Sequence, residues 1–149
     1  MPDTPDTSRA ETILAFDFGL RRIGVAVGQS VTASASPLGI VSNFESGPDQ
    51  NRITALVNEW QPARLIVGMP AHADGSPSEM QSHVRRFIET LADYKLPIDT
   101  VDERYTSIEA KATLKNARAA GTRGRISKES IDSAAAVFIA ERYLQSRAD

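Results

Sequence analysis

The sequence predicts an α/β fold with one mixed β-sheet that opens with an antiparallel hairpin and carries helices on both faces. Two short apolar runs near the start, residues 12–18 and 23–28, are joined by a brief polar connection. Apolar segments with the strand period and the helix period then alternate along the chain. The length of 149 residues, 41% of them hydrophobic, suits one domain with a single core.

The first half supplies the hairpin and the first strand–helix–strand unit. Thr12–Phe18 and Ile23–Gly28 are rich in β-forming residues, and a third strand is expected at Ser36–Val41. The segment Asp49–Trp60 carries apolar residues at helical spacing, and Gln61-Pro62 ends it. A buried strand is expected at Arg64–Val67.

The second half continues the alternation. Ser76-Pro77-Ser78-Glu79 predicts a capped helix that runs to about Leu91, and Leu96–Val101 predicts another strand. A second capping box opens a helix expected at Thr106–Ala119, followed by a glycine-broken loop. The last helix, Lys128–Gln145, is apolar nearly all round and should pack in the interior. This order of elements fits ribonuclease H-like domains, and other α/β domains as well.

Composition excludes several kinds of site. The absence of cysteine removes disulfides, thiol nucleophiles and cysteine-based metal sites, so any metal should be a hard cation with oxygen ligands. A net charge of −2 argues against a protein that coats nucleic acid over its whole surface. No apolar run spans a bilayer, and the start is unlike a secretory signal. We expect a cytoplasmic protein with a disordered tail at 1–11 and one domain at 12–149.

Three carboxylates stand out. Asp17 lies inside an apolar strand, where an ionised group needs a partner or a metal. An ion pair with Arg21 or Arg22, or a capping role at the hairpin, would also satisfy it. Glu103 follows a strand end, where sites form in α/β sheets, or it belongs to a surface turn. Asp132 precedes an apolar helical run, where it either meets a buried site or complements the helix N-terminus.

These three side chains could converge on one or two divalent cations, which would offset their mutual repulsion and their desolvation. Strand alternation places Asp102, the neighbour of Glu103, on the opposite face of the sheet. Mg²⁺ or Mn²⁺ held by three carboxylates suits phosphodiester hydrolysis, because the metal activates water and stabilises the leaving oxygen. Asp17, Glu103 and Asp132 are therefore the predicted catalytic and metal-binding residues.

Several blocks of the sequence resemble those of a known family. The blocks LAFDFGLRRIGVAVG, SPLG, LIVGMPAHADGS, VDERYTSIEA and KESIDSAAAVFIAERYL resemble the YqgF/RuvX family of ribonuclease H-like proteins. The resemblance runs from about Ile13 to Leu144, and its acidic positions fall on the same three carboxylates. It implies a nuclease of Holliday junctions or of the 5′ end of precursor 16S rRNA. Two positions depart from the family: Arg21 replaces a usual Lys, and Ala71-His72-Ala73 replaces a block that usually holds Asn.

Cationic residues supply candidate phosphate contacts. Six of the 17 basic residues fall within 111–128, a stretch without Asp or Glu. A solvated helix face would explain some of them, but the arginines of the glycine loop favour substrate binding. The predicted substrate-binding residues are Arg21, Arg22, His72, Lys115, Arg118, Arg123, Arg125 and Lys128, whereas His83 is expected to be structural.

The favoured function is a nuclease acting on nucleic acid, with RNA preferred and DNA possible. Two alternatives belong to other classes. An actin-like ATPase would share the Asp17-Phe18-Gly19 hairpin, but it needs a second domain that this length does not hold. A non-catalytic nucleic-acid binding module would keep the fold without cleavage. Junction resolution needs two symmetric cuts and hence a homodimer, whereas trimming an RNA end needs only a monomer.

Overall fold

The computed structural model describes residues 11–70, 79–102 and 128–148, of which 128–132 and 147–148 are described in their backbone only. Within these residues, no helix is long and apolar enough to cross a bilayer. The elements are β1 (Thr12–Asp17), β2 (Arg22–Gln29), β3 (Ser34–Phe44), β4 (Gly47–Pro48), α1 (Gln50–Trp60), β5 (Arg64–Met69), α2 (Met80–Leu91), the 3₁₀ helix η1 (Ala92–Tyr94), β6 (Ile98–Asp102) and α4 (Lys128–Ala148).

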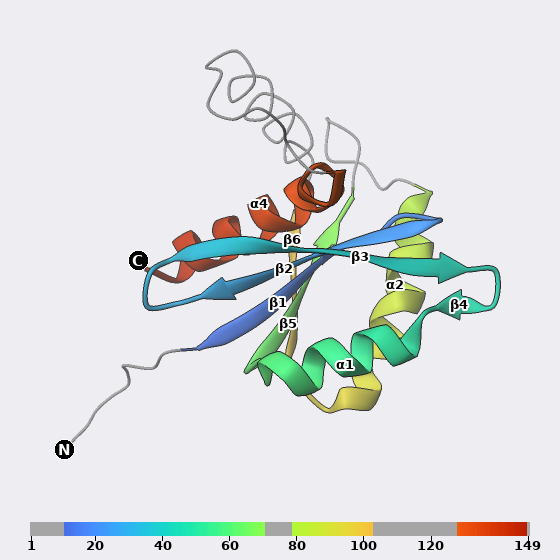
Figure 1. The fold of residues 1–149 in the computed structure, drawn as a ribbon, viewed down its shortest axis with the longest axis horizontal. Coiled ribbons are helices and arrows are strands. Elements are labelled where there is room, and N and C mark those ends of the chain that lie inside the picture. Colours follow the sequence, from blue (N-terminus) through green and yellow to red (C-terminus); the bar gives the residue numbers. More distant parts are fainter. Residues whose placement is uncertain (1–10, 71–78, 103–127, 149) are drawn as a thin grey trace, which may run out of the picture.

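The strands form one mixed sheet in the order β4-β3-β2-β1-β5-β6 (Figure 1). β1 pairs antiparallel with β2, and β2 pairs antiparallel with β3. On its other side β1 pairs parallel with β5, which pairs parallel with β6. The predicted mixed sheet with an antiparallel opening is confirmed, and β1 lies at the junction of its antiparallel and parallel halves.

The two faces of the sheet are covered by different helices. Along β1, Leu14 and Phe16 pack into a core cluster with residues of α1 and α2. Ile13 and Ala15 pack into a second cluster with residues of α4. Figure 1 shows α4 on one side of the sheet and α1 and α2 on the other. Strand alternation therefore gives both faces a core, as helices on both faces require.

Helix ends follow the sequence in part. The Asp49 side chain accepts a hydrogen bond from the backbone N–H of Arg52 and caps α1, which ends at Gln61 in the left-handed conformation with φ of 45°. α2 begins at Met80, and Glu79 precedes it without a side-chain cap. The rest of the predicted capping box, residues 76–78, lies outside the described residues, as do the predicted helix at 106–119 and the loop at 120–127.

Two elements differ from expectation. β3 is longer than the predicted Ser36–Val41, because its start pairs with the end of β2 and its end pairs with β4. α4 buries only one face, whereas burial nearly all round was predicted: Val137 and Phe138 remain partly exposed. The buried residues of its described side chains are Ser133, Ala136, Ile139, Ala140, Tyr143 and Leu144. The helix therefore lies across the sheet as a surface layer with one apolar stripe.

Glu11, the first residue that the structure describes, contacts β5 and the residue that follows β2. Its backbone N–H donates to the Ser30 hydroxyl at 2.7 Å, and its carboxylate lies 3.8 Å from the Nε of Arg64. Residues 1–10 lie outside the described part of the chain.

Candidate active site

Asp17 is the last residue of β1 and stands where that strand leaves the core. The four residues before it, Ile13 to Phe16, are fully buried, and Asp17 itself is partly exposed. Because Ile13 and Ala15 face α4, alternation places Asp17 on the α4 face as well. A carboxylate thus lies at the carboxyl end of the central strand, the edge at which sites form in parallel sheets.

The register of the parallel strands extends this edge to β6. Phe16 is opposite Val67 of β5, which is opposite Thr100 of β6. The next row outward therefore joins the positions of Asp17 and Val101. The three parallel strands end together on the side of the sheet where Asp17 emerges.

The face of β6 is also settled by its contacts. Val101 packs against the α4 cluster, and the Tyr143 hydroxyl of α4 donates to Asp99 Oδ2 at 3.0 Å. Asp99 and Val101 therefore share the α4 face. Asp102, the last residue of β6, is exposed. Glu103 itself lies outside the described residues.

Ser133 ties the beginning of α4 to the sheet. Its hydroxyl accepts a hydrogen bond from the Gly39 N–H at 3.0 Å and donates to the Gly39 carbonyl at 2.6 Å. Gly39 pairs with Val25, and Val25 pairs with Phe16. Ser133 is therefore anchored to the row of the sheet next to the row of Asp17, at Gly39, which lies two strand spacings or about 10 Å from Phe16.

Two arginines lie at this edge, Arg21 in the β1–β2 loop and Arg22 as the first residue of β2. Arg21 and Arg22 are both exposed. Asn43 of β3 holds the loop, since its side chain donates to the Gly19 carbonyl at 2.8 Å and its backbone N–H donates to the Arg21 carbonyl at 2.9 Å. A side chain at Gly19 would place its Cβ 2.5 Å from the Arg22 carbonyl oxygen, so the tight turn requires glycine. Two cations are thus held beside the end of β1.

The remaining predicted site residues cannot be placed. His72, Lys115, Arg118, Arg123 and Arg125, like Glu103, lie outside the described residues. Asp132 and Lys128 belong to α4, but their side chains lie outside the described part. Among the described side chains no group of three acidic, histidine or cysteine residues is close enough to share a metal ion. The structure thus places Asp17, Arg21 and Arg22 at one edge of the sheet.

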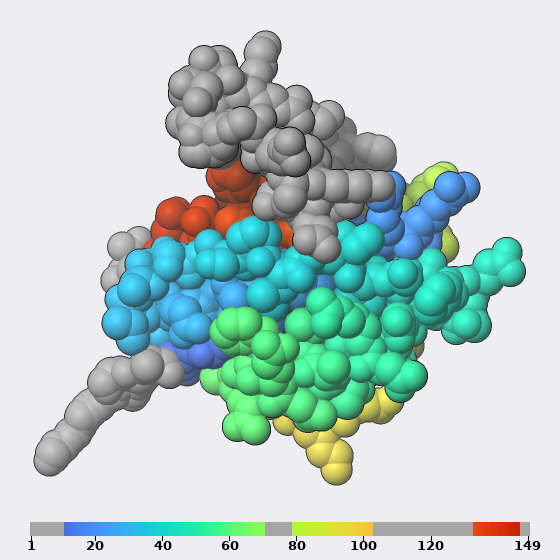
Figure 2. Space-filling view, viewed as in Figure 1, coloured from blue at the N-terminus to red at the C-terminus, as the bar shows by residue number. Residues whose placement is uncertain are grey.

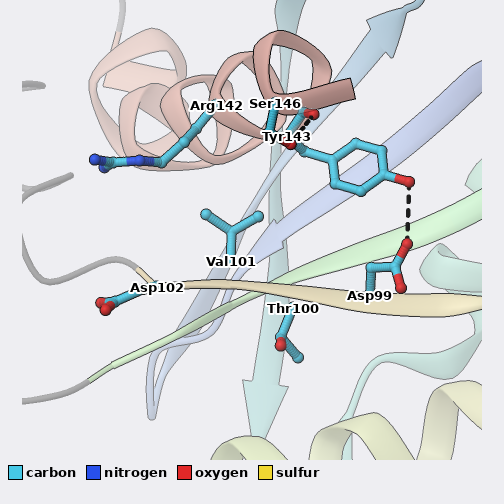
Figure 3. A pocket seen from close by; sticks show the side chains of 7 residues that line it. All are labelled: Asp99, Thr100, Val101, Asp102, Arg142, Tyr143 and Ser146. Carbon is cyan, nitrogen blue, oxygen red and sulfur yellow. Dashed lines mark hydrogen bonds between the residues drawn. The ribbon is translucent and has the colours of Figure 1, made fainter. Parts of the chain in front are cut away.

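A pocket between β6 and α4 contains residues that sequence reasoning missed (Figure 3). Figure 3 shows the bond between Asp99 and Tyr143 toward one end of the pocket, and the side chains of Asp102 and Arg142 toward the other. Asp99 also accepts a hydrogen bond from Arg64 of β5 at 2.9 Å. This network joins α4 to β5 and β6 near the starts of these two strands, at the end of the sheet opposite to Asp17.

The charge of Arg64 is secured by this network. Burial lowers the pKa of its guanidinium, but the hydrogen bond to Asp99 and the charges of Tyr143, Glu11 and Asp99 outweigh burial and leave the pKa raised. Only the alternation of Asp99 with apolar neighbours along its strand hinted at an inward-facing carboxylate.

Comparison with known proteins covers nearly the whole chain. A family model described as "RuvX: Holliday junction resolvase" matches residues 11–146. A relative from Hahella chejuensis is 45% identical over 93% of this chain and 86% of its own. One from Burkholderia lata is 41% identical over 96% of this chain and 95% of its own. Both carry the name "Putative pre-16S rRNA nuclease".

Solved structures resemble the fold at low sequence identity. RuvC of T. thermophilus in complex with a Holliday junction substrate has a TM-score of 0.57 at 11% identity, over 93% of this chain and 96% of RuvC. The Fowlpox virus resolvase in complex with Holliday junction DNA has a TM-score of 0.52 at 12% identity, over 93% of this chain and 99% of the resolvase. These resemblances concern the architecture, and they confirm the predicted ribonuclease H-like fold.

Proposed function

This chain belongs to the RuvX family, and from that premise we propose that it is a metal-dependent nuclease that hydrolyses phosphodiester bonds. The favoured substrate is the 5′ end of precursor 16S rRNA, which the names of its relatives indicate. Its place of action is the cytoplasm. The observation that carries the proposal is Asp17 at the carboxyl end of the central strand, facing α4.

We assign catalysis and metal binding to Asp17, Glu103 and Asp132. Register supports the first pair: Asp17 and Val101 lie in one row of the sheet, and continued strand alternation beyond Val101 would direct Glu103 to the same face. Two strands that end together bring these two positions to one edge.

Helix α4 supports the third carboxylate. Position 132 precedes the buried Ala136 by four residues and the buried Ile139 by seven, so helical periodicity places it on the stripe that meets the sheet. Its neighbour Ser133 is anchored one row from Asp17. Three carboxylates from two strands and one helix would then face a common space.

The donor set fits a hard divalent cation. The proposed ligands are carboxylate oxygens, which Mg²⁺ and Mn²⁺ prefer, and the chain has no cysteine to favour a softer metal. When bound, such a metal activates water and stabilises the leaving oxygen of the phosphodiester. The carboxylate of Asp17 would hold the metal at the sheet edge, where the partly exposed side chain is open to substrate.

The cationic residues bind and orient the substrate in this scheme. Arg21, in the loop that follows Asp17, and Arg22, at the start of β2, would hold phosphates beside the cleaved bond. His72, Lys115, Arg118, Arg123, Arg125 and Lys128 complete the proposed binding surface. These side chains would contact backbone phosphates, so they would contribute affinity rather than sequence preference.

Holliday junction resolution is the second candidate function. The family description and two junction-bound structural neighbours favour it. Two symmetric cuts would require a homodimer, whereas RNA trimming requires one active site. Cleavage of a precursor 16S rRNA fragment and of a four-way junction, measured together with the mass of the protein in solution, separates the two functions.

The test of the mechanism is Asp17→Asn, with Asp93→Asn as the matched control. Asp93 is an exposed carboxylate of η1, outside the proposed site. Asp17→Asn should lower the rate of metal-dependent cleavage by at least about a hundredfold, because even indirect supports of a metal site are worth 10- to 100-fold. Asp93→Asn should cleave like the wild type. Unchanged cleavage by a folded Asp17→Asn protein would remove Asp17 from the mechanism.

A further inference from the structure

A second hollow lies on the face of the sheet opposite the proposed metal ligands. It has a volume of about 450 Å³ and lies between the loop after β1, the β3–β4 hairpin and α2. We call it the hairpin groove, and its walls include Phe18, Leu20, Phe44, His83, Arg86 and Phe87. Figure 2 shows the hairpin projecting from the body of the protein. The volume is within the range of small-ligand sites.

The floor of the groove is aromatic and rigid. The rings of Phe18 and Phe87 lie with centroids 5.3 Å apart and an interplanar angle of 40°. Phe87 also contacts Phe16 edge to face at 5.5 Å, and both of these rings are buried in the core. The floor is therefore fixed by packing and needs no partner to form.

The walls expose apolar surface. Phe44 is 57% exposed and Leu20 is 56% exposed, and among the described residues Val31 is the other large hydrophobic side chain that is this open. The backbone of Phe44 is held because it pairs with Gly47 across the hairpin. Its neighbour Asn43 bonds to the loop that carries Leu20. A positioned, exposed aromatic residue is a suitable platform for a flat ligand.

The rim of the groove carries a cation next to its apolar walls. Arg86 and His83 of α2 line it on one side, and Glu45 of the hairpin lines it as well. His83, expected to be structural, is exposed on this surface. Aromatic faces combined with cations along a groove are the features by which proteins hold unpaired nucleotides, the bases by stacking and the phosphates by charge.

The groove adjoins the proposed active site through the chain itself. Phe18 follows Asp17 directly, and alternation directs the two side chains to opposite faces of the sheet. A strand of nucleic acid that crosses the β1–β2 loop would thus meet Asp17 on one side and the groove on the other.

We infer that the hairpin groove binds an unpaired base of the substrate, stacked on Phe44, while Arg86 contacts a nearby phosphate. This inference rests on the proposed nuclease function and narrows its substrate to nucleic acid with a single-stranded stretch beside the cut. Bases within a continuous duplex are already stacked and paired, so they cannot enter the groove.

The test measures binding without cleavage. A labelled oligouridylate is titrated with protein in EDTA, so that no divalent metal is present. Phe44→Ala should weaken binding about tenfold, the scale of one base stacked on an aromatic ring. The matched control is Val31→Ala, which removes an equally open side chain, 72% exposed, beyond the far end of β2. It should bind like the wild type.

Two further measurements identify stacking as the cause. Phe44→Trp should restore affinity, and its fluorescence should be quenched by the oligouridylate. An oligonucleotide of abasic sugar-phosphate units should bind the wild type and Phe44→Ala equally, and so should a duplex. Equal affinity of the wild type and Phe44→Ala for the oligouridylate would overturn the inference. It would also be overturned if Phe44→Ala weakened binding of the abasic strand as much as binding of the oligouridylate.

The binding test of the groove and the cleavage test of Asp17 can fail independently of each other. If the wild type fails to bind any nucleic acid, both proposals fail. If Phe44→Ala weakens binding but Asp17→Asn still cleaves, the groove stands and the assignment of Asp17 falls. If Asp17→Asn abolishes cleavage and Phe44→Ala binds normally, only the groove falls.

Discussion

The hydroxyl of Ser133 makes both a donated and an accepted hydrogen bond with one residue, Gly39, across 94 positions of sequence. Gly39 has a φ of +104°, and the register of β2 with β3 shifts beside it, between Val25 and Ala26. This bulge lets the N–H and the carbonyl of Gly39 bond to the Ser133 hydroxyl of α4. The start of α4 is thereby fixed on the sheet next to the row of Asp17.

Ser133→Ala should destabilise the protein by about 1–3 kcal/mol, because it leaves two buried polar groups of Gly39 without their partner. Chemical denaturation measures this loss as a lower midpoint with an unchanged slope. The control is Ser146→Ala on the same helix, whose exposed hydroxyl donates only to the Tyr143 carbonyl one turn earlier. Equal midpoints for the two variants would contradict the anchoring role of Ser133.

Gly19→Ala should disturb the loop that carries Arg21 and leads into Arg22. The added Cβ would lie 2.5 Å from the backbone oxygen of Arg22, and a backbone atom cannot yield as a flexible side chain can. We expect a loss of about 1–3 kcal/mol in the free energy of unfolding, the range of overpacking. Cleavage should fall as well, because the loop follows Asp17. A variant as stable and as active as the wild type would show that the turn is not tight.

The hydrogen bond between Tyr143 and Asp99 should contribute measurably to the stability of the protein. Tyr143→Phe keeps the buried ring and removes the hydroxyl, so it should cost about 0.5–1.5 kcal/mol. The bond is partly exposed, which keeps the expected loss at this modest level. Tyr94→Phe is the comparison, since its hydroxyl bonds to Thr54 and Gln50 at an exposed site. Thermal unfolding of the two variants should rank Tyr143→Phe as the less stable.

The sequence predicts most of the fold, since the features involved are local. Two apolar, β-rich runs at 12–18 and 23–28 predict the hairpin, and apolar residues at helical spacing after Asp49 predict α1. The extent of β3 depends on β4, a two-residue strand that no periodicity reveals. The partial exposure of α4 was missed because an alanine-rich helix looks apolar on every side, whereas only the packing decides which side meets the sheet.

The site is harder to predict from the sequence than the fold is. Asp17 can be recognised because a carboxylate interrupts an apolar strand. Phe44 cannot, because an exposed phenylalanine in a hairpin is indistinguishable in sequence from a core residue. Arg64, Asp99 and Tyr143 meet through tertiary packing between residues 35 and 44 positions apart, and no local pattern predicts which of several charged partners will pair.

The pH dependence of stability should carry a contribution from Glu141. Burial raises the pKa of its carboxyl above the ordinary value of 4.5. The folded state therefore holds this proton more tightly than the unfolded chain does, so the group stabilises the fold below pH 4.5 and this stability is lost as the pH rises through the raised pKa. At neutral pH the ionised Glu141 is a small penalty.

Glu141→Gln removes the titrating group while keeping the shape of the side chain. The variant should be slightly more stable than the wild type at pH 7, within the about 0.5 kcal/mol usual for surface substitutions, and this advantage should shrink as the pH falls toward 4. Thermal unfolding of both proteins over this pH range measures the difference, in which the titration of the other carboxylates cancels. Glu89→Gln, at an exposed position of α2, should show no such trend. An advantage that grows toward low pH would mean that the Glu141 carboxylate is stabilised rather than penalised by its surroundings.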